Sequence, residues 1–225
     1  MNKKNCIFNI TIKLRKDYIF RTYTLASISV FVTLIFTCYN IYLGIAFNTS
    51  WNISIAVYYI FLLSIKLIVL LNQKKLSKLN LSYNLKNKKT AKFYLNQSIM
   101  LFIIDLMLMA PIILLIMQKK DVHYTKIAAI ATATYTISKI FMATKNTLTA
   151  KKIENLSIKM LRQINLKDAL VSILTLQYIL IVTFDEGITK EMQILSIISS
   201  FAIWTILIVI SICNLKNAIK MKKSV

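Results

Sequence analysis

The chain has 225 residues, 57% of them hydrophobic, and carries 29 lysines and arginines against 8 acidic residues, a net charge of +21. Soluble domains are only about 45–50% apolar, and the apolar residues here form long blocks separated by basic segments, which excludes an ordinary soluble domain. The sequence therefore predicts an all-α, polytopic bundle of transmembrane helices.

Residues 1–21 form a basic segment ahead of the first apolar block. Apolar residues recur in it every four positions from Cys6 to Tyr18, which would place a stripe along one side of a helix. We expect a basic amphipathic segment that lies on an anionic membrane surface, or a positive anchor that only sets the topology. The following apolar run lacks a small-x-small cleavage site, so we expect it to be retained.

No charged residue occurs in the 44 residues from Thr22 to Ile65. At about 20 residues per span, this stretch predicts two helices, 23–46 and 53–71, joined by a turn near 48–52. Residues 22–225 as a whole are expected to form one membrane domain.

Both of these helices show a polar seam. Asn40 lies on the polar face of the first helix, and Tyr59 and Lys66 follow one another at a heptad interval on the second. Since Lys66 is only about five residues from the predicted end of its span, we expect its ammonium group to extend to the membrane interface.

The third predicted span, 95–117, holds the carboxylate Asp105 near its middle and the only proline, Pro111. Asp105 would lie about 15 Å from either end, where a charge costs at least about 3 kcal/mol unless something compensates it. Two interpretations stay open: a proton or cation site within the bundle, or a structural pair or hydrogen-bonded acid. Pro111 predicts a kink.

The fourth predicted span, 125–145, is rich in small residues, which allow helices to approach closely in a membrane. Lys139 shares a face with several of them, so it should point toward a neighbouring helix. We expect this helix to be central and Lys139 to pair with Asp105, with Lys66 as the competing partner. The small residues on this face are Ala128, Thr132 and Thr136.

The last third of the chain begins with a basic segment, 146–167, whose apolar face predicts a helix lying on the membrane surface. Two further spans, 169–184 and 192–214, follow and are joined by an acidic connection. Gln177 is a polar candidate inside the fifth span.

The cations are distributed unevenly between the two sides of this predicted topology. Twenty-three lie in the N-terminal segment, the 72–94 loop, the 145–167 segment and the tail, and four lie in the opposite connections. The positive-inside rule then predicts six spans in three hairpins, with both termini cytoplasmic. The same bias predicts attraction to the anionic leaflet of a cell membrane and no nucleic acid partner.

The three hairpins also suggest a faint internal repeat. Cations open the first, third and fifth spans at Arg21, Lys92 and Lys167, at similar intervals. Any six-span chain with cytoplasmic cations would partly show this pattern.

No catalytic or metal-binding motif accompanies this architecture. The sequence holds no nucleophile elbow, paired metal ligands, phosphate-binding glycine loop or acidic metal cluster, and its three cysteines are far apart. We therefore expect no enzyme, no cofactor and no metal.

Four short motifs stand out: YNIYLGI at 39–45, SWN at 50–52, the Tyr58-Tyr59 pair, and NLKDALVSILTLQ at 165–177. In these the chain resembles a family of uncharacterised integral membrane proteins from Firmicutes. The resemblance implies a bacterial host and transfers no catalytic residue. It also implies an arginine late in the second span. Lys66 stands there instead and keeps the positive charge, but it cannot form the bidentate hydrogen bonds of a guanidinium group.

Three functional hypotheses follow. The favoured one is a noncatalytic membrane component that acts through protein or lipid partners or as a homo-oligomer. The alternative is a small-solute or ion transporter with Asp105 as an intramembrane proton or cation site, and a membrane enzyme comes third. The polar seams favour a transporter, whereas the two glycines leave little scope for the broken helices that transporter sites use.

Overall fold

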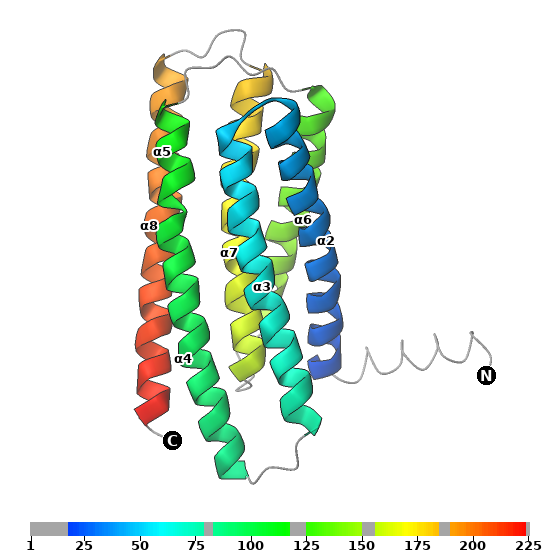
Figure 1. Cartoon of the computed structure of the whole chain (residues 1–225), viewed down its shortest axis with the longest axis vertical. Helices are drawn as coiled ribbons and strands as arrows, with labels where there is room; N and C mark the ends of the chain where they lie inside the picture. Colours follow the sequence, from blue (N-terminus) through cyan, green and yellow to red (C-terminus); the bar gives the residue numbers. More distant parts are fainter. Residues whose placement is uncertain (1–17, 79–82, 118–124, 150–155, 185–189, 224–225) are drawn as a thin grey trace, which may run out of the picture.

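The computed structural model describes residues 18–78, 83–117, 125–149, 156–184 and 190–223, and these ranges contain helices and no strand. The helices stand side by side in a single bundle (Figure 1). Six helical segments are long and apolar enough to cross a membrane, which confirms the predicted six-span, all-α class. In chain order the helices are α2 (Tyr18–Ala46), α3 (Ser50–Lys78), α4 (Tyr83–Met107), its continuation α5 (Met109–Met117), α6 (Lys126–Thr149), α7 (Leu156–Phe184) and α8 (Lys190–Lys223).

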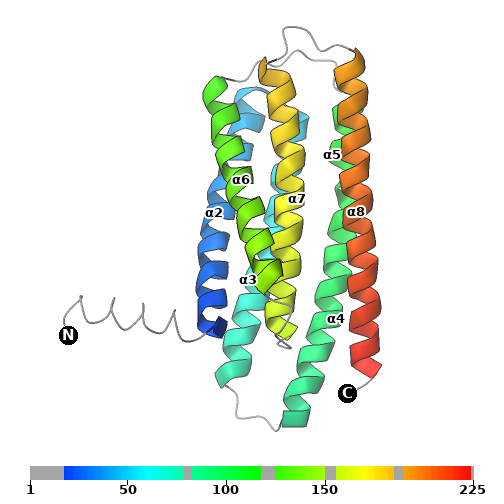
Figure 2. The same cartoon turned by 180° about the vertical axis from the view of Figure 1, so that it is seen from behind.

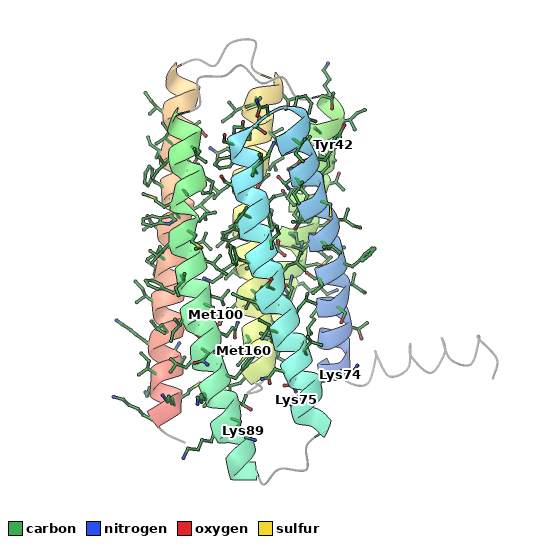
Figure 3. The ribbon with its side chains drawn as sticks, viewed as in Figure 1. Tyr42, Lys74, Lys75, Lys89, Met100 and Met160 are labelled. Atoms are coloured by element: carbon green, nitrogen blue, oxygen red, sulfur yellow. The ribbon has the colours of Figure 1, made fainter. Side chains whose placement is uncertain are left out.

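The chain passes alternately up and down through the bundle, as the three predicted hairpins require. Helix α2 therefore begins and α8 ends at the same end, which we call the terminal end (Figures 1 and 2). Lys74, Lys75 and Lys89 lie toward this end, whereas Tyr42 lies near the opposite end, where α2 turns into α3 (Figure 3). The basic ends of the helices thus gather on one side of the apolar bundle.

Helix α7 starts much earlier than predicted. The surface helix expected over 146–167 is wrong from Leu156 onward, because these residues form the first turns of α7, and its apolar stripe is buried inside the bundle. No glycine or proline interrupts α7, so its helical hydrogen bonds continue through the charged residues that precede the long apolar run. Residues 150–155 of that predicted helix lie outside the described part of the chain, as does all of the basic segment before Tyr18.

Helix α7 is also the centre of the bundle, packing against α2, α3, α4, α6 and α8. The prediction that the fourth span, α6, is central is wrong, because α6 packs mainly against α7 and meets α2 only through side chains such as Lys139 and Tyr135. The small face of α6 accounts for that close contact, and Thr136 Oγ1 donates a hydrogen bond to the main-chain oxygen of Ser172 across it, at 3.0 Å.

The three hairpins do not pack alike. Helices α2 and α3 form a close pair, whereas α4 packs chiefly on α8, more than 80 residues further along the chain. Lys167 lies within α7 and does not open its span, which removes one of the cations on which the suggested repeat depended.

The third span is interrupted near its proline. Helix α4 ends at Met107 and α5 begins at Met109, with Leu108 between them. Pro111 has no N–H to donate to the carbonyl of Met107 four residues earlier, and its ring crowds that carbonyl. The predicted kink thus appears as a short break just beyond Asp105.

The α2–α3 turn depends on a close approach at Gly44. A Cβ atom at this position would lie 2.6 Å from Ile53 Cγ1 and 3.1 Å from the Ile53 main-chain nitrogen. The Gly44 carbonyl also accepts a hydrogen bond from the Thr49 N–H at 2.9 Å, and Asn48 takes a positive φ of 50° in the turn. The missing side chain therefore lets the two helices meet directly beside the turn.

Gly44→Ala should destabilise the protein by about 1–3 kcal/mol, because the added methyl group forces the first turn of α3 away from α2. The measurement is the thermal unfolding midpoint of the detergent-purified protein. Ile45→Ala is the matched control, because Ile45 is 72% exposed on the outside of the bundle and its truncation should change the midpoint little. Equal effects of the two substitutions would contradict the close approach.

Candidate functional site

Two adjacent residues of opposite charge, Lys167 and Asp168, lie in the middle of α7. Both side chains are fully buried, and the membrane-spanning part of this helix runs from Ile158 to Thr183. Successive residues in an α-helix point about 100° apart, so the two charges face different neighbours. Each one is the centre of a separate polar cluster.

The Asp168 cluster contains Asp168, Lys66, Lys139, Ser29, Thr33 and Tyr135. Asp168 Oδ2 accepts hydrogen bonds from Lys139 Nζ at 2.5 Å, Thr33 Oγ1 at 3.0 Å and Lys66 Nζ at 3.3 Å. Tyr135 Oη donates to the other carboxylate oxygen, Oδ1, at 3.1 Å. One carboxylate thus joins α7 to α2, α3 and α6.

The two lysines of this cluster also share hydroxyl partners on α2. Lys139 Nζ donates to Thr33 Oγ1 at 2.6 Å and to Ser29 Oγ at 3.3 Å, and Lys66 Nζ donates to Ser29 Oγ at 2.9 Å. With its bond to Asp168, Lys139 uses the three donors of an ammonium group, whereas Lys66 makes two such bonds. The predicted polar face of the first span therefore supplies acceptors for both lysines.

An aromatic group covers the cluster on the side away from the terminal end. The Phe36 ring stacks on Tyr135 with 3.6 Å between ring centroids and meets Tyr59 edge-on at 5.5 Å. These rings come from α2, α6 and α3, the helices that supply the charged and hydroxyl groups. These buried rings leave little room for water beside the ion pairs on this side, and so keep the surrounding dielectric low.

The Asp105 cluster lies on the other side of α7 and contains Asp105, Lys167 and Ser211. Lys167 Nζ donates to Asp105 Oδ2 and to Ser211 Oγ, and Ser211 Oγ donates to the same carboxylate oxygen at 2.5 Å. Trp204 Nε1 donates to the main-chain oxygen of Asp105 at 3.0 Å. This cluster joins α7 to α4 and α8.

The five buried charges of the described residues do not balance. Three are lysines and two are aspartates, and the excess cation lies in the Asp168 cluster, where one carboxylate faces two lysines. The Asp105 cluster has one charge of each sign, but Asp105 Oδ1 has no hydrogen-bond partner among the described residues. The Asp168 cluster therefore holds one positive charge in excess, and the Asp105 cluster has one carboxylate oxygen that no described residue contacts with a hydrogen bond.

A third polar group lies on the same three helices as the Asp105 cluster, nearer the terminal end. Gln163 Nε2 of α7 donates to Tyr94 Oη of α4 at 2.9 Å and to Asn214 Oδ1 of α8 at 2.7 Å. The helices α4, α7 and α8 are thus joined by polar contacts at two levels, one at Gln163 and one at Lys167.

The structure changes the predicted partners of the intramembrane charges. Asp105 is buried as expected, but the prediction that it pairs with Lys139 is wrong, because its cation is Lys167. Lys139 does point toward a neighbouring helix, where it meets Asp168. The prediction that Lys66 reaches the interface is also wrong: its side chain is 1% exposed, and α3 continues about 18 Å beyond it.

The three uncharged candidates lie in different places. Asn40 is buried and donates to the main-chain oxygen of Phe36 within its own helix at 2.8 Å. Tyr59 is buried in the aromatic group above the Asp168 cluster. Gln177 lies between α7 and α8, where its Nε2 atom donates to Ser199 Oγ. The polar seams of α2 and α3 meet where Lys66 donates to Ser29. Gln177 lies outside them, in the contact between α7 and α8.

Sequence analysis missed the two residues at the centre of the site. Lys167 and Asp168 stand directly before the apolar run 169–184, so hydropathy placed them outside the fifth span and Lys167 was counted among the cytoplasmic cations. The available signal was the buried stripe that begins before them at Ile158 and Ile164 and continues after them, with no helix breaker between. Two adjacent opposite charges inside such a stripe indicate partners on two sides.

No protein-family model, curated protein or solved structure matches the chain. The architecture itself is plain: six helices suited to cross a membrane make this a multi-pass membrane protein.

Asp105→Asn and Lys167→Met should each cost about 3–5 kcal/mol, because either change leaves the other charge buried without its counter-ion. The double variant should recover most of the loss, giving a large coupling energy. The measurement is thermal unfolding of both single variants and the double variant in detergent.

The control cycle combines Asp105→Asn with Lys139→Met, whose losses should add to within about 0.5 kcal/mol because the two residues belong to different clusters. Strong coupling in this cycle, with additive losses for Asp105 and Lys167, would restore the pairing predicted from the sequence.

Removal of each member of the Asp168 cluster should give graded losses of stability. Asp168→Asn should cost about 3–5 kcal/mol because two lysines lose their anion. Lys139→Met should cost less, and Lys66→Met least, about 1–2 kcal/mol, because Lys66 makes the longer contact and its loss removes the excess cation. A Lys66→Met loss as large as that of Asp168→Asn would contradict this account.

Proposed function

We propose that this protein is a noncatalytic component of a bacterial cell membrane, whose charged core holds six helices in one arrangement and which acts through protein or lipid partners. The observation that carries the proposal is that the two clusters together draw a side chain from every one of the six spans. A core of this kind specifies which helices are neighbours. Fixing the register and the partners of packed helices is the best-attested use of buried polar groups. Asp105 then has a structural role.

The basic end of the bundle supports a lipid partner. Lysines of α3, α4 and α8 lie there, including Lys74, Lys75 and Lys89 (Figure 3). Four exposed lysines end α8: Lys216, Lys220, Lys222 and Lys223. Each cation near a charged leaflet contributes about 1 kcal/mol, so this end is suited to anionic headgroups. By the positive-inside rule it faces the cytoplasm, with both termini there.

The resemblance to a membrane protein family from Firmicutes supports the bacterial host. Such membranes present an anionic inner leaflet to a basic protein surface, which agrees with the proposed orientation. The residues of that resemblance also include both members of the Lys167–Asp168 pair.

A second candidate function, an ion or small-solute transporter, is favoured by one specific observation. Asp105 Oδ1 lacks a hydrogen-bond partner among the described residues, although the carboxylate is buried at mid-span. Intramembrane acids of this kind often carry protons or cations. A transporter would use Asp105 as a site that is loaded and emptied, whereas a structural core would hold its ion pair throughout.

Reconstitution into liposomes distinguishes the two candidates. Vesicles that hold a pH-sensitive dye, under an imposed proton gradient and a potassium diffusion potential, should show no more flux with the protein than without it. Asp105→Asn protein serves as the matched sample. A proton or cation flux that the wild-type protein supports and Asp105→Asn abolishes would replace the proposal with the transporter.

The lipid partner is tested by native mass spectrometry of protein extracted from mixed phosphatidylglycerol and phosphatidylcholine membranes. Changing the four lysines that end α8 to glutamine should reduce the phosphatidylglycerol retained per protein several-fold. Lys126→Gln, an exposed lysine at the other end of the bundle, should leave it unchanged. Equal retention in both variants would contradict a lipid partner at the basic end.

A further inference from the structure

Buried polar atoms without hydrogen-bond partners lie along the three helices α4, α7 and α8. Gln97 is 2% exposed, and neither its amide nitrogen nor its amide oxygen has a partner among the described residues. Gln163 Oε1, Asn214 Nδ2 and Asp105 Oδ1 are in the same condition. Since nearly all buried polar groups in proteins are hydrogen-bonded, often to internal water, each such atom needs an explanation.

These atoms extend in one direction from Asp105. Gln97 precedes Asp105 by about 12 Å along α4, Gln163 precedes Lys167 by about 6 Å along α7, and Asn214 follows Ser211 by about 4–5 Å along α8. Because α4 and α7 run away from the terminal end and α8 runs toward it, all three lie on the terminal side of the Asp105 cluster (Figures 1 and 2). Together they form a polar track on the terminal side of the carboxylate.

The members of this track reach across the three helices. Gln163 contacts both Tyr94 of α4 and Asn214 of α8, and its oxygen and the Asn214 nitrogen stay unpartnered beside those bonds. Lys167, four residues after Gln163, continues the same face of α7 to Asp105 and Ser211. A buried water needs two to four polar partners, and such partners recur along the track at intervals of one or two helical turns.

On its own span, the residues that follow Asp105 are apolar. Leu108 and Ile112, which follow on the same span, are fully buried, and Trp204 covers the main-chain oxygen of Asp105 from α8. Apolar cavities and contacts of this kind exclude water. The carboxylate therefore has polar neighbours on the terminal side and apolar neighbours from its own span on the other side.

We propose that a column of water enters between α4, α7 and α8 from the terminal end and reaches the Asp105–Lys167 pair, so that protons exchange with Asp105 from that side. This inference does not rest on the noncatalytic role proposed above, since a hydrated ion pair can be structural or mechanistic. The unpartnered oxygen of Asp105 receives its hydrogen bond from the innermost water. Gln163, Asn214 and Gln97 hold the waters nearer the surface.

Cysteine accessibility tests the column. In a background with the three native cysteines changed to serine, Ser211→Cys places a thiol at its inner end, and Val209→Cys places one at similar depth facing lipid, since Val209 is 54% exposed. Methanethiosulfonate ethylammonium reacts with thiolates, which form in water and not in hydrocarbon. In lipid nanodiscs, where the reagent reaches both faces, Ser211→Cys should react at least about tenfold faster than Val209→Cys.

Two further variants make the result decisive. Asn214→Cys and its lipid-facing neighbour Ile212→Cys give the same comparison one turn nearer the surface, and they decide the matter if Ser211→Cys does not accumulate as folded protein. Leu108→Cys should stay unmodified, because it lies beyond the end of the column. Equal rates at the inner and lipid-facing positions, or rapid modification of Leu108→Cys, would overturn the proposal. Because the cysteine test measures thiol modification and not ion flux, its outcome is independent of the liposome experiment.

Discussion

The arrangement of the bundle depends on the compensation of two adjacent charges, Lys167 and Asp168, within a helix that crosses the membrane. Neither charge is tolerable in hydrocarbon without a partner, and helical geometry directs them about 100° apart. Asp168 therefore draws in α2, α3 and α6, while Lys167 draws in α4 and α8. A shift of α7 by one residue would move one of the two charges into the other's place, beside a charge of its own sign, so the pair also determines the register of the central helix.

The two clusters formed in this way differ in chemistry. Asp168 receives four hydrogen bonds, from two lysines, a threonine and a tyrosine, and aromatic rings cover it, so its environment is closed. Asp105 has one oxygen without a hydrogen-bond partner among the described residues, and Gln97, Gln163 and Asn214 on its terminal side also have amide atoms without such partners. The same requirement for charge compensation thus yields a closed site on one side of α7 and a site suited to water on the other.

Much of the fold follows from the sequence, since hydropathy and the distribution of lysines depend on single segments and their lengths. The six spans, the alternating direction of the helices and the burial of Asp105 and Lys139 were all predictable in this way. Pair assignments were not, because a depth argument allows any two charges at similar depth to meet, and it chose Lys139 for Asp105. The close partner of Asp105 lay in a segment whose charges made it look like a loop.

The sequence by itself determined that this chain is a bundle of six membrane-spanning helices with its cations concentrated at one end, because the cost of placing polar groups in hydrocarbon acts on each segment separately. Only the tertiary structure decided which helix is central, that α4 packs on α8, and that Asp168 is shared by Lys66 and Lys139. These features depend on which faces meet in three dimensions. Buried charges compensate one another through space, and their separation along the chain carries no information about that contact.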